Sequence, residues 1–151
     1  MALDDHIRIL SRVRLFEDLT QDQLRLLAFG AELMQLQPDR KLFREDDDAD
    51  SAYVVLSGRI SLYRENDGER IDLGTVGPGA MLGELALIAD SRRLTSAVAK
   101  SDADVLRLSR SMFRRILEEY PETAQALHAR ITEDLQAMLR RIEKLGPRFA
   151  S

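Results

Sequence analysis

The sequence predicts an α+β domain in which an antiparallel β-barrel or sandwich lies between N-terminal helices and a long C-terminal helix. Apolar residues recur with helical spacing near both ends of the chain, and short β-branched runs separated by turn residues fill the middle. A length of 151 residues is typical of one domain. We therefore expect a single domain over residues 1–151, with helices over 1–30, β-structure over 31–109 and helices over 110–146.

The N-terminal residues favour two helices. In the first helix, apolar side chains recur at i, i+4 and i+7, as one helix face requires: Leu3, Ile7 and Leu10. The second helix begins after Thr20, because Thr20 and Gln23 have the spacing of a capping box, in which each side chain bonds the other residue's backbone N–H. Gly30 is suited to end this helix.

The middle of the chain consists of short strands joined by turns. The expected strands cover residues 52–56, 60–63, 71–73, 98–99 and 105–108. Asn66, Asp67 and Gly68 form a strong turn signal between two of them. Many short strands about ten residues apart are typical of barrels and sandwiches.

The C-terminal part is helical again. Phe113 and Ile116 mark a short helix, and Pro121 suits the first turn of a longer one. The longer helix carries apolar residues at heptad-like spacing: Leu127, Ile131, Leu135, Met138, Ile142 and Leu145. This seam is longer than one barrel would cover, so we expect a parallel homodimer through the final helix. The alternative is that the helix folds back and buries the seam on its own domain.

The composition excludes several kinds of site. The chain has no cysteine, which removes disulfides, thiol nucleophiles and thiolate zinc sites. His6 and His128 are the two histidines, so one chain cannot supply a three-imidazole metal centre. The acidic run at 45–50 lacks the glycine and the final glutamate of a calcium loop, so we expect a solvated turn there. No catalytic motif is present, and we expect neither an enzyme nor a bound cofactor.

Charge and hydropathy exclude other partners. The net charge of −4 argues against a nucleic-acid binder, and the six residues after Leu145 are too few for a DNA-reading module, so we expect no direct DNA binding. No run approaches the about 18 apolar residues of a membrane span, and the N-terminus is not a secretory signal. We therefore expect a cytoplasmic protein.

The segment at 77–99 carries the most chemical information. A glycine-rich turn precedes Gly83 and Glu84, and the residues that follow favour a short helix whose unpaired N–H groups could meet a phosphate. Glu84 can accept hydrogen bonds from ribose hydroxyls, and Arg93 can bind two phosphate oxygens. Two interpretations remain open on these residues alone: a receptor for an anion and a hydroxyl, or a capped helical turn with a surface arginine.

The run from Gly83 to Leu87, followed by Arg93, resembles the phosphate-binding cassette of cyclic nucleotide-binding domains. Such domains occur in catabolite-activator and Fnr-type regulators, in regulatory subunits of protein kinase A and in cyclic nucleotide-gated channels. The similarity extends over nearly the whole chain and includes the Tyr-Val-Val-Leu-Ser-Gly run ending at Gly58. It implies an antiparallel β-roll or jelly-roll barrel (double-stranded β-helix) with a cassette at 83–95.

The resemblance also implies roles for individual residues. Glu84 would bind the ribose 2′-hydroxyl, and Arg93 would pair with the cyclic phosphate, assisted by backbone N–H groups near Ala86 and Leu94. The implied ligand-binding residues are Gly83, Glu84, Leu85, Ala86, Arg93, Leu94 and Thr95. The implied ligand is cAMP or cGMP, with cAMP favoured, and the final helix would signal to an unidentified effector protein. Arg92 should face solvent, since neighbours in an extended segment point to opposite sides.

Several positions depart from the family pattern. Arg92 replaces the usual proline, and Leu94 replaces a small residue after the arginine. Met138 and Leu139 stand where transcription-factor relatives carry a Thr-Ser pair that contacts the purine. Asp39 and Asp46 replace common glycines; Asp tolerates left-handed turn geometry better than most residues. These departures define the alternative function, a dimerisation or protein-interaction module whose nucleotide pocket is vestigial.

Overall fold

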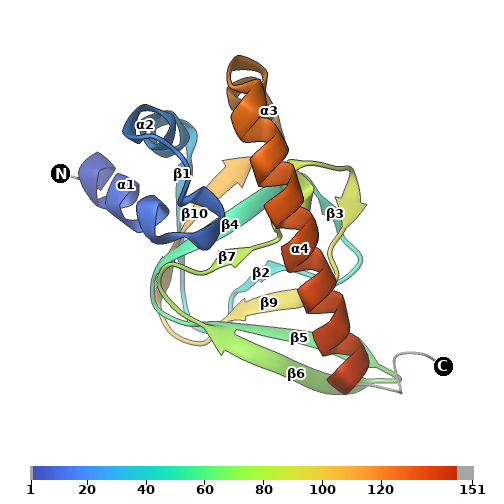
Figure 1. Ribbon diagram of the computed structural model, residues 1–151. Coiled ribbons are helices and arrows are strands. Elements are labelled where there is room, and N and C mark those ends of the chain that lie inside the picture. Colours follow the sequence, from blue (N-terminus) through green and yellow to red (C-terminus); the bar gives the residue numbers. More distant parts are fainter. Residues whose placement is uncertain (1, 146–151) are drawn as a thin grey trace.

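The computed structural model describes residues 2–145. Figure 1 shows short strands curved into a barrel, the N-terminal helices packed together at one end, and the last helix crossing the barrel. The helices are α1 (Ala2–Arg12), α2 (Gln21–Gly30), α3 (Arg110–Glu119) and α4 (Pro121–Leu145), with short 3-10 helices η1 (Arg14–Phe16) and η2 (Glu84–Leu87). The strands are β1 (Glu32–Leu36), β2 (Lys41–Phe43), β3 (Asp48–Ala49), β4 (Ser51–Ser57), β5 (Ile60–Asn66), β6 (Glu69–Val76), β7 (Met81–Leu82), β8 (Ser91–Arg92), β9 (Ser96–Ala99) and β10 (Ala103–Ser109).

All strand pairs are antiparallel. One four-stranded sheet has the order β1-β10-β4-β7 and the other β2-β9-β5-β6, while β3 pairs with β8 as a two-stranded ribbon. The predicted α+β class, with an antiparallel β-roll between N-terminal helices and a long C-terminal helix, is confirmed.

The turn chemistry follows the sequence closely. Asp67 and Gly68 join β5 to β6 with φ of 54° and 79°, the two left-handed residues of a tight hairpin turn, as the Asn66-Asp67-Gly68 signal predicted. Asp39 and Asp46 each have a φ of 70°, so both hold the left-handed geometry expected for them.

The capping box of α2 forms as predicted and also reaches α4. The Thr20 N–H donates to Gln23 Oε1 at 2.9 Å, and the Gln23 N–H donates to Thr20 Oγ1 at 3.2 Å. The Gln23 side chain is buried, and its Nε2 donates to Thr123 Oγ1 at 3.2 Å. One residue therefore closes the start of α2 and ties it to the first turn of α4.

Two groups of buried side chains form the core. The first joins the helices to β4 and β10, and Phe16 and Phe113 meet in it with ring centroids 6.5 Å apart. The second fills the barrel interior and includes Leu36, Val55, Ile60, Leu73, Leu82, Ala97 and Val105. Strand β7, which immediately precedes the cassette segment at 83–95, contributes Leu82 to this second group. The start of the cassette segment is therefore anchored on the barrel core.

Helix α4 is 25 residues long, although no helix of residues 2–145 has the apolar length that a membrane crossing demands. Near its middle, Arg130 forms ion pairs with Glu17 at 2.9 Å and Asp18 at 2.7 Å. Nearer its end, Arg141 Nη2 donates to the Leu73 carbonyl of β6 at 2.6 Å. The helix is thus attached to the N-terminal segment and to the barrel.

The apolar seam of α4 faces its own domain. Leu127 and Ile131 are 3% and 0% exposed and belong to the helical core group, while Leu135 and Met138 are partly buried. Two seam side chains lie outside the described residues: Ile142 and Leu145. The described part of the seam therefore follows the fold-back alternative, and the homodimer remains a prediction.

Replacing Ile131 with Ala should lower the free energy of unfolding by about 2–5 kcal/mol, because the side chain is fully buried and its truncation leaves a cavity. Leu26→Ala is the matched control on α2: Leu26 is 42% exposed, and truncating it should change stability by about 0.5 kcal/mol or less. Chemical denaturation of both variants measures the difference. Equal losses would show that α4 does not pack as described.

Candidate functional site

The cassette begins with a glycine that the geometry requires. Gly83 precedes η2 with a φ of 72°, in the left-handed region, and a Cβ placed there would collide with Nη1 of Arg93. Strand β7 leads into this glycine and is held by β4 through the Tyr53–Leu82 pair. The barrel therefore fixes the start of η2 beside Arg93.

A cavity of about 50 Å³ lies between the cassette and α4, with room for a few water molecules. All seven residues implied as ligand-binding line it: Gly83, Glu84, Leu85, Ala86, Arg93, Leu94 and Thr95. Six further residues complete the lining: Phe43, Ala49, Ser91, Arg92, Leu135 and Met138. Most of the segment at 83–95 thus lines one cavity, and its role in ligand binding stays a prediction.

Arg93 is the central polar group of this cavity. Its side chain is buried, with the residue only 6% exposed, and its Nε and Nη1 have no hydrogen-bond partner among the described residues. Its guanidinium carbon lies 4.4 Å from the ring centroid of Phe43 and 5.5 Å from that of Tyr53. Burial lowers the pKa of Arg93 from its ordinary value, although Tyr53 and nearby aspartates oppose this shift. Arg93 is therefore a buried cation with two N–H groups that no described residue accepts from.

The backbone of Arg93 is held on both sides. Its N–H donates to the Asp47 carbonyl and its carbonyl accepts from the Asp46 N–H, each at 2.8 Å. The neighbouring Arg92 is exposed, as predicted, and its Nη1 donates to the Asp46 carbonyl at 3.2 Å. The two arginines therefore have different environments, and only Arg93 is buried in the cavity wall.

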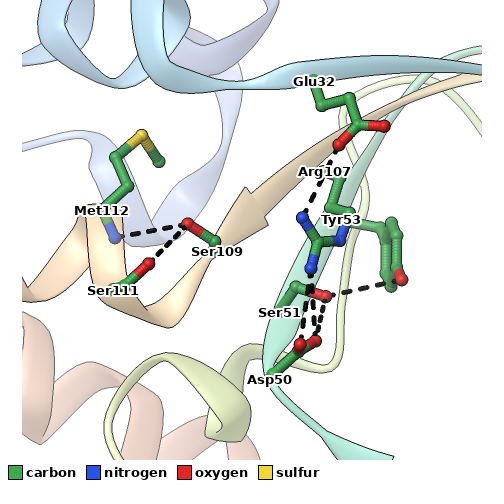
Figure 2. A network of polar contacts seen from close by, with 8 residues as sticks. All are labelled: Glu32, Asp50, Ser51, Tyr53, Arg107, Ser109, Ser111 and Met112. Carbon is green, nitrogen blue, oxygen red and sulfur yellow. Dashed lines mark hydrogen bonds and ion pairs between the residues drawn. The ribbon is translucent and has the colours of Figure 1, made fainter.

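A polar network that includes Tyr53 also contains the carboxylate of Asp50 (Figure 2). Ser51 Oγ lies 3.0 Å from Asp50 Oδ1 and 3.4 Å from Tyr53 OH. Arg107 Nη2 lies 3.4 Å from both Asp50 oxygens, and its Nη1 lies 3.6 Å from Glu32. The hydrogen bond from Ser51, with further help from Arg107, lowers the pKa of Asp50. Asp50 is thus paired with Arg107, and no described carboxylate forms an ion pair with Arg93.

Glu84 opens η2 and is partly buried. Burial raises the pKa of Glu84 to about 7, and the negative charge of Asp134 on α4 raises it further, while a hydrogen bond from its own backbone N–H opposes the shift. A carboxyl group with this pKa is partly protonated at neutral pH. It can accept a hydroxyl hydrogen bond from one wall of the cavity.

The backbone N–H of Ala86, which was expected to assist a phosphate, already donates a hydrogen bond within the protein. The Ala86 N–H donates to the Gly83 carbonyl at 3.1 Å within the 3-10 turn, so it is not free in this structure to assist a phosphate. The reason is the tight i→i+3 bonding of η2, which the sequence pattern could not distinguish from an open helix start.

The sequence interpretation missed part of the lining. Phe43 lies in a three-residue strand with no clear periodicity, and its position after Asp39 and before the acidic run gave no signal of its contact with Arg93. Leu135 and Met138 were assigned to the dimer seam, but they form the wall opposite the cassette. Together the residues offer an anion receptor, a hydroxyl acceptor and an apolar wall. The described residues contain no cluster of metal-ligating side chains.

Comparisons with known proteins agree with this geometry. A protein called cyclic nucleotide-binding-like from Brucella abortus is 57% identical, with a TM-score of 0.70 over 76% of this chain and 99% of that chain. The regulatory domain of Toxoplasma gondii PKA, solved with cAMP, is 31% identical, with a TM-score of 0.72 over 76% of this chain and 44% of that chain. Rat patatin-like phospholipase domain-containing protein 7 is 29% identical over 105 residues, which are 69% of this chain and 8% of that protein.

The chain spans only 6–8% of the length of the rat protein and of other curated relatives that it matches. The model of the cyclic nucleotide-binding domain matches residues 33–120, more than half of the chain, and includes the whole cassette. That family consists of regulatory binding domains. The chain therefore belongs to the cyclic nucleotide-binding domain family.

Proposed function

We propose that this chain is a regulatory sensor in the cytoplasm that binds a cyclic nucleotide and signals to a partner protein through α4, without catalysing a reaction. The observation that carries the proposal is the buried guanidinium of Arg93, whose Nε and Nη1 have no partner in the part of the chain that the structure describes. A buried charge without a counter-ion is costly, and a cyclic phosphate would supply the missing charge and acceptors. cAMP is the nucleotide that we put first, because it is bound in the 31% identical Toxoplasma structure.

The remaining cassette residues support the same ligand. Glu84 would accept the ribose 2′-hydroxyl, while Gly83 leaves space for the guanidinium of Arg93. Leu85, Ala86, Leu94 and Thr95 would enclose the phosphate and sugar, since they line the same cavity. The backbone N–H of Leu94 remains a proposed phosphate donor.

Signalling would pass through α4. Leu135 and Met138 contact the cavity from this helix, and the cavity of about 50 Å³ is small for a nucleotide. Ligand entry would therefore displace the part of α4 that carries these side chains. A displaced helix presents a different surface to an effector protein, which is a population shift of the kind that regulatory domains use.

A second candidate is an interaction module with a vestigial pocket. The small cavity and the bulk of Leu94, where relatives have a small residue, favour it. In that case Arg93 would be a structural cation stacked on Phe43.

Arg93→Ala should weaken cAMP binding about ten- to a hundredfold, because it removes a charge-assisted contact of roughly 1.5–3 kcal/mol. Arg92→Ala is the control and should change affinity by less than about threefold, since Arg92 is exposed. Isothermal calorimetry measures both. No heat and no thermal stabilisation with millimolar cAMP or cGMP would favour the vestigial module, because a bound ligand must raise stability.

Glu84→Gln should stabilise the ligand-free protein at pH 8 by roughly 1–2 kcal/mol, allowing for partial exposure of the carboxyl group. The pKa of Glu84 is about 7 in the folded chain and 4.5 ordinarily, so folding favours the neutral carboxyl group. The free energy of unfolding is therefore not reduced by this group below pH 4.5, and it falls as pH rises through 7 and the buried group ionises. Gln is neutral throughout, so the gain should nearly vanish at pH 4.5. Thermal unfolding at both pH values tests this, with exposed Glu65→Gln as control. An equal gain at both pH values would contradict a raised pKa.

The predicted homodimer has its own test. Leu139 on α4 is 41% exposed, so it is available for a contact between two copies. Light scattering at tens of micromolar should give a dimer mass, and Leu139→Asp should reduce it to a monomer, whereas Gln136→Asp, also exposed on α4, should not. A monomeric mass for the unaltered chain would end the dimer proposal.

A further inference from the structure

The connection between β2 and β3 brackets Arg93. The Asp46 N–H donates to the Arg93 carbonyl, and the Asp47 carbonyl accepts from the Arg93 N–H, each at 2.8 Å. Just before the connection, the ring centroid of Phe43 lies 4.4 Å from the guanidinium carbon of Arg93. Asp46 has a φ of 70°, a left-handed geometry that is unfavourable for a residue other than glycine. The connection therefore needs other contacts that keep it in this conformation.

Glu45 supplies such contacts by attaching the connection to two strands of the barrel. Its Oε2 accepts hydrogen bonds from Arg64 of β5, from Nε at 3.1 Å and from Nη2 at 2.8 Å. Its Oε1 accepts from the Glu65 N–H, also in β5, at 3.2 Å. The Glu45 N–H donates at 2.8 Å to Oγ of Ser96, a buried residue at the start of β9. Both carboxylate oxygens and the backbone N–H of Glu45 are therefore bonded to the barrel.

Glu45 differs from the acidic residues that follow it. The sequence predicts a solvated turn over residues 45–50, and four of its acidic residues are exposed: Asp46, Asp47, Asp48 and Asp50. The side chain of Glu45 is only 17% exposed, and that of its partner Arg64 is 27% exposed. Solvent screens such a half-buried, charge-assisted contact less than it screens a surface ion pair. The Glu45 carboxylate is therefore suited to hold the connection in place.

We infer that Glu45 is a positioning residue for Arg93: it fixes the connection that brackets Arg93 and follows Phe43, and thereby sets the guanidinium for the phosphate of a ligand. The identity of that ligand rests on the proposed function, whereas the position of Arg93 rests on the contacts of Glu45. Glu45 would act through Arg93 and not on the ligand, since the described lining of the cavity does not include it. A guanidinium on a fixed backbone loses less freedom when it binds an anion.

Amide exchange in the ligand-free chain tests the positioning. Glu45→Gln keeps the size of the side chain but removes its charge and one of its two acceptor oxygens. The connection should then open more often, and the amide protons of Asp46 and Arg93, which bond across it, should exchange at least about fivefold faster. The amide proton of Val54, which is buried in β4 between β10 and β7, should not accelerate to the same extent.

Asp48→Asn is the matched control, because it removes an exposed carboxylate from the same acidic run. It should leave the exchange of the Asp46 and Arg93 amides within about twofold of the unaltered chain. If Glu45→Gln destabilised the whole domain, the Val54 amide would accelerate as much as the Arg93 amide, since both would exchange through global unfolding. That result, or unchanged exchange at Arg93, overturns the inference.

Calorimetry with cAMP tests whether the positioning matters for binding. Glu45→Gln should weaken cAMP binding about three- to tenfold, and Asp48→Asn should weaken it less than about twofold. Because Glu45 acts through Arg93, adding Glu45→Gln to Arg93→Ala should weaken binding by less than about twofold more. An equal loss with and without the Arg93 guanidinium would show that Glu45 acts by another route, which overturns the inference.

Failure of the inference and failure of the proposed function are distinguishable. If the unaltered chain binds cAMP and Glu45→Gln leaves the affinity unchanged, the inference is overturned and the proposed function stands. If the unaltered chain binds neither cAMP nor cGMP, the proposed function is overturned, and the exchange of the Arg93 amide still decides whether Glu45 positions Arg93.

Discussion

The burial of the Arg93 guanidinium determines much of the structure around it. Its positive charge is stabilised by cation–π contacts with the ring faces of Phe43 and Tyr53. Its Nη1 comes so close to Gly83 that no side chain fits there, and its backbone bonds to residues 46 and 47 hold the β2–β3 connection beside it. Tyr53 in turn lies within the network of Ser51, Asp50 and Arg107.

Two of the charged side chains that line the cavity, those of Arg93 and Glu84, lower the stability of the fold. Arg93 is buried with its Nε and Nη1 unpaired among the described residues, and the burial of Glu84 disfavours its ionised form. Side chains held in this way are typical of binding sites rather than of cores, where polar groups are paired. The compensation comes from elsewhere in the chain, chiefly from the two apolar groups that pack the barrel and join it to the helices.

The sequence predicted best those features that depend on neighbouring residues. The capping box at Thr20 and the tight turn at Asp67 are local, and both form as expected. Strands of two or three residues, such as β2, β7 and β8, were not predicted because they are too short to show a period and exist through their partners.

The cassette side of the site was predicted from its motif, and the opposite wall was not. The spacing of apolar residues in a helix cannot distinguish packing on its own barrel from packing on a second copy, since both bury the same side chains. Phe43 is distant in sequence from Arg93, and the pairing of β2 with β9 and of β3 with β8 brings the two segments together.

The attachment of α4 changes along its length. Up to Ile131 the helix is held by buried side chains and by the ion pairs of Arg130, and Gln23 adds a bond at its first turn. Beyond Asp134 the described side chains that attach it are the partly buried Leu135 and Met138, which line the cavity, and Arg141, which donates a hydrogen bond to the Leu73 carbonyl. Local opening costs least where few buried contacts must break. Amide protons on the cavity-facing half of the helix should therefore exchange with solvent sooner than those of its first half.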